Sequence, residues 1–241
     1  MARLRGELAD GAVLVPACEL ALALHRWGGG AYGDLVDASD GAPVPVHHKG
    51  SRDASAVPAQ ATHVQLALEE AYYLAYRTGV LEVRRGGVLL NSDTVFWPHL
   101  ARAASSARFA HELAAYVHLR AAGWLVRPGS HFGADFVLYE PAAAHAHAPL
   151  CALVTAPGVD PPLTWRTLQM HTRLSAQVAK GLVLCEVVEG EGGGCSIARY
   201  AVRAQRVGRW LPGKAHGELT ESAGPPKADG GKRKRAACEP T

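Results

Sequence analysis

The chain has 241 residues, of which 48% are hydrophobic and 7% aromatic, and its formal net charge is +3. This length suits one large domain or two small ones, and the nearly balanced charge excludes a strong field over the whole molecule, so that any nucleic-acid surface must be local. The five cysteines include no CxxC pair, which argues against a zinc site. No apolar run exceeds strand length and the N-terminus is not of the secretory type, which argues against a membrane span and against export. We therefore expect a soluble intracellular protein.

The first hundred residues are predicted to form a small α+β domain. A strand with a Gly turn is expected within 7–15, followed by a short apolar helix that ends at three consecutive glycines. The packing face of this helix is expected to include its large apolar residues, Leu20, Leu22, Leu24 and Trp27. Residues 37–61 are rich in Pro, Gly, Ser, Ala and Asp, which is typical of a long loop insertion.

The pattern becomes sharper from Thr62. Apolar residues at three- and four-residue spacing predict a helix that begins near Thr62, a possible cap, and ends at Gly79. A small hairpin around Gly86 and Gly87 and a helix from about Asn91 follow. The aromatic residues of this region are expected in the core or in an interface, and none suggests chemistry: Tyr72, Tyr73, Tyr76, Phe96 and Trp97.

Residues 105–210 are predicted to form a second domain, of the α/β class with a mixed sheet. An amphipathic helix ending at Gly123 precedes three short strands, WLVRPG, DFVLY and PLCALVTA, which are expected to run antiparallel. A helix with Thr164 as candidate cap and two long strands follow. The last strand, at 195–207, is expected to be an exposed edge that needs a partner.

Residues 212–241 have the composition of a disordered tail. The tail contains four consecutive basic residues, Lys232 to Arg235. Two interpretations remain equally open, a merely solvated tail and a nuclear localisation signal or RNA-binding arm.

Three side chains of the second domain suit metal-free cleavage of a phosphodiester bond. Such cleavage needs a base for the 2′-hydroxyl, an acid for the leaving 5′-oxygen and a cation for the charge that builds on phosphorus. Tyr139 ends a strand, His147 lies on the next loop and suits a general acid, and Lys180 precedes a buried strand. A phenol is a poor base near pH 7 unless a cation favours its phenolate, so Lys180 would also serve Tyr139. Each of these three residues could also have a purely structural role, so the residue types alone do not determine the function.

Two strings carry a resemblance to the tRNA-splicing endonuclease family: GWLVRPGSHFGADFVLY, and LTWRTLQMHTRLSAQVAKGLVLCEV further on, with a His between them. The resemblance covers residues 105–210, and LEEAYYLAYRTGVLEV at 68–83 resembles the N-terminal region of the family. The chain is most similar to the eukaryotic catalytic subunit that cuts the 5′ splice site. The resemblance implies a nuclease-like second domain in which Tyr139 is the base, His147 the acid and Lys180 the stabiliser of the transition state. The products would be a 2′,3′-cyclic phosphate and a 5′-hydroxyl, with no metal and no other cofactor.

The resemblance also implies how the RNA is held and with what the protein assembles. Family members grip a base of the bulged intron in a cation–π clamp, whose positions match Arg173 and Trp210 here. The expected partners are intron-containing pre-tRNA and other subunits of the endonuclease, in a heterotetramer located in the nucleus and not at a membrane.

Some positions depart from the family pattern. Leu150 stands where the family usually has a tyrosine, three residues after the catalytic His, and the short loop offers His145 as an alternative acid. Asp135 is expected to be structural, and residues 150–156 lack the acidic residue that a restriction-type metal nuclease would need. Two alternatives to a catalytic subunit are a non-catalytic structural subunit of the same complex and an RNA-binding protein with a degenerate nuclease fold.

Overall fold

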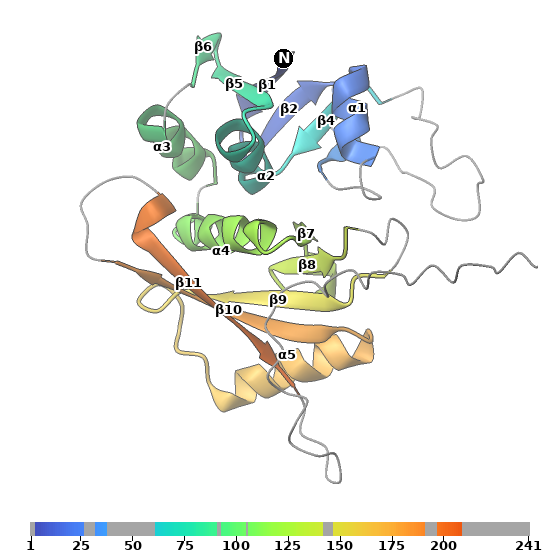
Figure 1. Ribbon diagram of the computed structural model, residues 1–241. Coiled ribbons are helices and arrows are strands. Elements are labelled where there is room, and N and C mark those ends of the chain that lie inside the picture. The colour runs from blue at the N-terminus through green and yellow to red at the C-terminus, as the bar shows by residue number, and fades with distance from the viewer. Residues whose placement is uncertain are drawn as a thin grey trace, which may run out of the picture.

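The computed structural model of the chain describes residues 3–26, 32–37, 61–90, 93–104, 106–141, 147–190 and 197–208. Two mixed sheets and five α-helices organise these residues, which confirms the predicted α/β class (Figure 1). No helix among the described residues is long and apolar enough to cross a membrane. Residues 38–60 of the loop predicted at 37–61 and the tail from Pro212 lie outside the described residues.

The first sheet has six strands. They are β1 (Leu4–Ala9), β2 (Ala12–Pro16), β3 (Asp34–Val36), β4 (His63–Leu66), β5 (Leu81–Arg85) and β6 (Val88–Leu89), in the order β3-β4-β2-β1-β5-β6 across the sheet. Only β1 and β5 pair in parallel. The segment predicted as one strand with a Gly turn is the β1–β2 hairpin, and Gly11, with φ +79°, makes its tight turn. The predicted hairpin at Gly86 and Gly87 is also present.

Two helical predictions in this half need correction. Helix α1 (Glu19–Arg26) is present, and Leu22 and Leu24 pack against the core as predicted, but the helix buries Ala21 and leaves Leu20 38% exposed. Trp27 lies outside the described residues. The helix predicted from Thr62 is wrong over 63–66, which form β4 between β2 and β3. Burial alternates along β4, with Val64 and Leu66 inside, so that pairing with two distant strands outweighs the helical spacing.

The helix itself begins at Leu68 as α2 (Leu68–Tyr72) and continues as a π-helical turn over Tyr73–Arg77. Gly79, with φ +66°, follows the last turn, as predicted. The prediction that the aromatic residues of this region lie in the core or in an interface is confirmed for three of them, because Tyr72, Phe96 and Trp97 are buried. Tyr76 is 38% exposed and stacks on Tyr72 and Phe96.

Helix α4 (Phe109–Ala121) lies between the two sheets (Figure 1). Phe109, Leu113 and Val117 pack into the core of the first sheet together with α3 (Asp93–Ala104). Tyr116 and Leu119 pack into the core of the second sheet. All five of these predicted apolar positions are buried, so that one helix serves two cores.

The second sheet has five strands. They are β7 (Leu125–Pro128), β8 (Phe136–Tyr139), β9 (Leu150–Thr155), β10 (Gly181–Glu189) and β11 (Tyr200–Val207), in the order β11-β10-β9-β8-β7. The antiparallel run β7-β8-β9 is as predicted, and β9 and β10 are parallel. Helix α5 (Trp165–Gln177) connects β9 to β10 and covers the face of the sheet opposite to α4 (Figure 1). Strand β11 is an edge strand, as expected, but it begins at Tyr200, after a 3-10 turn at Ile197–Arg199.

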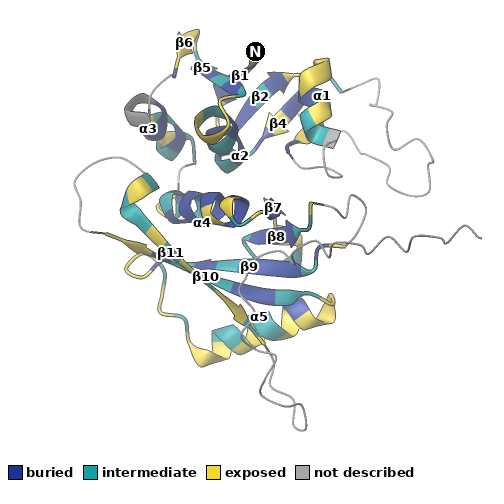
Figure 2. Ribbon diagram, in the orientation of Figure 1, coloured by how far each residue is buried: buried dark blue, intermediate teal, exposed yellow. Residues whose placement is uncertain are grey.

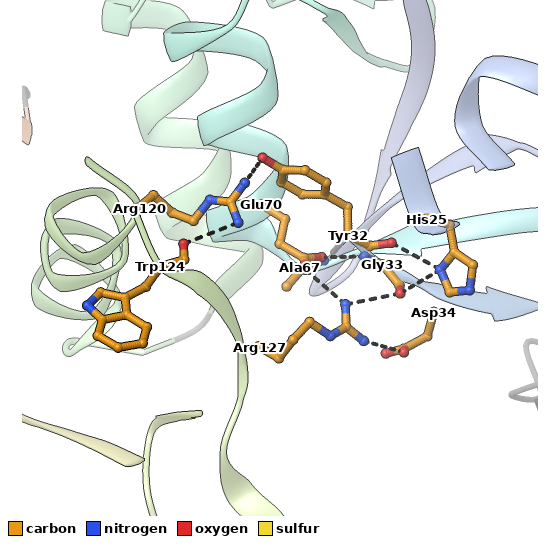
Figure 3. A network of polar contacts seen from close by, with 9 residues as sticks. All are labelled: His25, Tyr32, Gly33, Asp34, Ala67, Glu70, Arg120, Trp124 and Arg127. Carbon is orange, nitrogen blue, oxygen red and sulfur yellow. Dashed lines mark hydrogen bonds and ion pairs between the residues drawn. The ribbon is translucent and has the colours of Figure 1, made fainter. Parts of the chain in front are cut away.

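A buried ion pair joins helix α2, in the first half of the chain, to strand β7 of the second sheet (Figure 3). Glu70 is 2% exposed and accepts hydrogen bonds from the backbone N–H groups of Gly33 and Ala67, at 3.1 and 3.0 Å. Its other oxygen lies 3.1 Å from Nη1 of Arg127, on β7. Arg127 also pairs with Asp34, on β3. Because both charges are paired and hydrogen-bonded, this contact fixes how the first sheet sits on the second.

A second arginine reinforces the same junction (Figure 3). The guanidinium of Arg120, on α4, donates to the hydroxyl of Tyr32 and lies 4.5 and 5.1 Å from the ring centroids of Tyr32 and Tyr73. Burial raises the pKa of Tyr32 to about 12, although the charge of Arg120 acts in the opposite direction. The phenol is therefore a neutral hydrogen-bonding group that helps to hold β3 against α4.

Candidate active site

Strand register brings Tyr139, His147 and Lys180 to the same end of strands β8, β9 and β10 in the second sheet. Tyr139 is the last residue of β8, where Leu138 pairs with Leu150 at the start of β9. Lys180 immediately precedes β10, where Gly181 pairs with the same Leu150 and its N–H donates to the carbonyl of Pro149 at 2.9 Å. His147 lies just before β9. The end of one strand and the beginnings of the next two therefore meet, although they are distant in the sequence.

The backbone of Lys180 is fixed by the C-terminus of α5. The N–H of Lys180 donates to the carbonyl of Ser175 at 2.9 Å, and that of Ala179 to Ala176 at 3.2 Å. These two bonds form a Schellman motif, in which the residue after the C-cap adopts the left-handed conformation. Ala179 takes that place, with φ +53°, and it is the one described non-glycine residue with positive φ. The turn delivers Lys180 from the helix directly to the start of β10.

The side chain of Lys180 is also held. Its Nζ donates to the carbonyl oxygen of Ala148 at 2.7 Å and lies 4.8 Å from the ring centroid of Phe132. The ring stabilises the cation by a cation–π contact, and an ammonium has three donors, so that others remain for a phosphate oxygen. The sequence analysis missed Phe132 and Ala148, because neither carries a reactive group. Phe132 lies in the 3-10 turn Ser130–Phe132, between β7 and β8.

Tyr139 lies on the α5 face of the sheet. Val137, two residues before it on β8, packs in a cluster with Cys151, Leu182 and Leu168 of α5, and Tyr139 packs against that cluster while remaining half-buried. Lys180 and Phe132 belong to the same side. The phenol of Tyr139 therefore lies at the border of the α5 face, and the side chain of Lys180 lies on the same face.

His147 is exposed, whereas the next residue, Ala148, is buried and is the acceptor for Lys180. An exposed imidazole is suited to donate a proton to a leaving oxygen, and Lys180 is bonded to the residue that follows it. The alternative acid, His145, lies outside the described residues, so the choice between the two histidines stays a prediction.

Of the two residues expected to bind RNA, Arg173 and Trp210, the structure describes only Arg173. Arg173 lies on α5 and is exposed. Trp210 lies outside the described residues. Asp135 has the structural role expected: its Oδ2 accepts from the N–H of Val154 at 2.6 Å, and its Oδ1 lies 3.4 Å from Arg108. It comes just before β8, at the other end of that strand from Tyr139.

Cys151 lies beside the candidate site and does not add a nucleophile. Burial raises the pKa of its thiol, while the charge of Lys180 and a hydrogen bond with Ser175 lower it. Because the thiol is completely buried and its pKa is raised, Cys151 is a packing residue of the α5 face.

Comparisons with known proteins cover both halves of the chain. A model of the tRNA intron endonuclease N-terminal domain matches residues 4–96, and a model of the tRNA intron endonuclease catalytic C-terminal domain matches residues 109–193, the range that contains Tyr139, His147 and Lys180. The tRNA-splicing endonuclease subunit Sen2-1 of Arabidopsis thaliana is 31% identical over 157 residues, 62% of this chain and 65% of that protein. The subunit Sen2 of Mus musculus is 29% identical over 133 residues, 53% of this chain and 28% of that protein. The chain thus spans less than two thirds of the length of these relatives.

Proposed function

The chain belongs to the tRNA intron endonuclease family, and we propose that it is the endoribonuclease subunit that cuts pre-tRNA at the 5′ splice site. The observation that carries the proposal is the meeting of Tyr139, His147 and Lys180 at the same end of strands β8, β9 and β10, with Lys180 bonded to the residue after His147. A base, an acid and a cation are the groups that metal-free cleavage of a phosphodiester needs.

The proposed reaction is a transfer within the RNA. Tyr139 takes the proton of the 2′-hydroxyl, and the freed oxygen forms a bond to phosphorus. The bond from phosphorus to the 5′-oxygen breaks, and His147 donates a proton to that oxygen. Lys180 stabilises the charge on the non-bridging oxygens between these steps. The products are a 2′,3′-cyclic phosphate and a 5′-hydroxyl, and no metal takes part.

We also propose where the chain acts and with which partners. The chain would act in the nucleus, within a heterotetramer of endonuclease subunits, and the edge strand β11 is suited to pairing with another subunit. Arg173 and Trp210 would clamp an unpaired base of the intron. Such a contact tolerates any sequence, which suits an enzyme that responds to the shape of its substrate.

The experiment is cleavage of an intron-containing pre-tRNA by the reconstituted complex in the presence of EDTA. We expect cutting at the 5′ splice site, with a cyclic phosphate on the released 5′ fragment, detected by mass spectrometry. His147→Ala should abolish this cut while His145→Ala, the matched control, retains it.

Three outcomes would contradict parts of the proposal. Loss of activity in His145→Ala alone would show that the other histidine is the acid. Full activity in both variants would overturn the catalytic assignment. Inhibition by EDTA would overturn the metal-free mechanism.

A further inference from the structure

Helix α5 packs on the second sheet but leaves most of its residues exposed to solvent or only partly buried. Of its residues only Ser175 is buried, whereas most residues of α4 are. Trp165, the first residue of α5, is 72% exposed, the highest value among the exposed large hydrophobic side chains that the structure describes. Figure 2 shows α5 as a largely exposed helix on the outside of the second sheet. A large aromatic side chain displayed in this way is available to stack on a ligand.

The charge of α5 indicates what it contacts. Its sequence, WRTLQMHTRLSAQ, contains two arginines and no acidic residue. Arg166 and Arg173 are both exposed and two helical turns apart, which places them on the same outward side. Among the described residues, neither forms a hydrogen bond or an ion pair. This side of the helix therefore offers two free cations beside an exposed indole.

Two carboxylates on segments next to α5 have partners of the opposite charge elsewhere. Asp160, in the loop before α5, lies 2.8 Å from Nε of Arg108 and accepts from the N–H of Ala156 at 2.9 Å. Glu186, on the α5 face of β10, has Arg203 directly opposite on β11. The outward side of α5 is therefore positive and complements a polyanion.

The backbone that carries Trp165 is fixed at the start of α5. Two consecutive prolines, Pro161 and Pro162, restrict the backbone that leads to the helix. Thr164 is the N-cap and accepts from the N–H of Thr167 at 3.1 Å, as the sequence predicted. Because the backbone is already ordered, binding at Trp165 does not need to order this segment of the chain.

We propose that the outward side of α5 binds the pre-tRNA away from the scissile phosphate, with Trp165 stacking on an unpaired base and Arg166 contacting the phosphate backbone. The inference rests on the proposed function and adds two residues to it. Trp165 precedes Lys180 by the length of α5, about 20 Å at 1.5 Å per residue. A contact so far from the reacting atoms acts on binding and not on the chemical step. Exposed aromatics beside arginines are the usual means of holding unpaired bases.

The test uses the reconstituted complex and an intron-containing pre-tRNA, with binding measured by filter retention and cleavage measured at saturating complex. We expect Trp165→Ala to weaken pre-tRNA binding at least about fivefold, with an unchanged rate of cleavage once the RNA is bound. Trp165→Phe, which keeps an aromatic face, should restore most of the affinity. Arg166→Gln should reduce the slope of log affinity against log salt concentration by about 1. Val88→Ala is the control, because Val88 is 64% exposed on β6 of the other sheet.

Each outcome decides the matter. Unchanged affinity in both α5 variants, with a wild-type complex that cuts, would overturn this inference and leave the proposed function intact. Loss of the other subunits from Trp165→Ala, with unchanged RNA affinity of what remains, would show that α5 docks a protein and would also overturn it. A wild-type complex that neither binds nor cuts pre-tRNA would overturn both proposals.

Discussion

The ammonium of Lys180 donates a hydrogen bond of 2.7 Å to the carbonyl oxygen of Ala148. Because Ala148 follows His147 directly, this bond ties the segment that carries the candidate acid to the start of β10. The two residues are 32 positions apart in the chain, and the parallel pairing of β9 with β10 brings them together. The candidate site is therefore held together by backbone register and by one anchored cation.

Replacing Lys180 should affect catalysis far more than stability. We expect Lys180→Gln to lower the rate of 5′-site cleavage by about 10²- to 10³-fold at saturating pre-tRNA, because a donor to the developing charge is lost. The lost bond to Ala148 should lower the free energy of unfolding by only about 1 kcal/mol. Single-turnover kinetics and urea unfolding measure the two effects. A variant that binds pre-tRNA more weakly but cuts the bound RNA at the wild-type rate would contradict the assigned role.

The turn before Lys180 is strained, since Ala179 has φ +53°. A left-handed conformation costs a residue with a Cβ about 1–2 kcal/mol, part of which glycine recovers despite its greater freedom when unfolded. We therefore expect Ala179→Gly to raise the free energy of unfolding by roughly 0.5–1 kcal/mol with no loss of activity. Ala176→Gly is the matched control: Ala176 is exposed within α5, and its replacement should lower stability by about 1 kcal/mol. The idea fails if urea unfolding finds both variants destabilised alike.

The ion pair between α2 and β7 should be costly to break from one side. Glu70→Ala leaves Arg127, with 18% side-chain exposure, without its buried partner, and we expect a loss of about 3–5 kcal/mol in unfolding free energy. Glu82→Ala is the control. It removes a surface pair with Arg3, whose side chain is 58% exposed, and should cost less than about 1 kcal/mol. Similar losses in the two variants, measured by chemical denaturation, would show that the buried pair does not fix the junction.

Glu69 predicts a dependence of stability on pH. Burial raises the pKa of this carboxyl to about 7, with a further contribution from the neighbouring charges of Glu112 and Glu70. The folded state therefore keeps the proton that the unfolded chain releases near pH 4.5. The contribution of Glu69 to stability is complete below about pH 4.5, is lost as the pH rises to about 7, and is constant above that.

The corresponding experiment compares the wild type with Glu69→Gln, which cannot ionise. At about 1.4 kcal/mol per pKa unit, the difference in unfolding free energy between the two should change by up to about 3 kcal/mol between pH 4.5 and 7.5, in favour of the variant at the higher pH. Parallel curves for the two proteins would show that the pKa of Glu69 is not raised.

Much of the local structure followed from the sequence because it depends on neighbouring residues. The apolar spacing of α4, the cap at Thr164 and the glycine turns at Gly79 and Gly87 are all local signals, and the structure confirms each of them. The strings around Tyr139 and Lys180 likewise identified the family. Where a local signal was ambiguous, the prediction was wrong: residues 63–66 have helical spacing, and their pairing with β2 and β3 makes them a strand.

The sequence alone thus determined the fold class, most of the helices and the family, along with the residue types suited to the chemistry. Only the tertiary structure decided that Lys180 is anchored to Ala148 and Phe132, that Glu70 and Arg127 join α2 to β7, and that Trp165 is exposed. The physical reason is that each of these features depends on burial or pairing between segments far apart in the chain. The order of residues in the sequence does not state which residues of distant strands pair with one another, and this pairing positions the segments that carry these features.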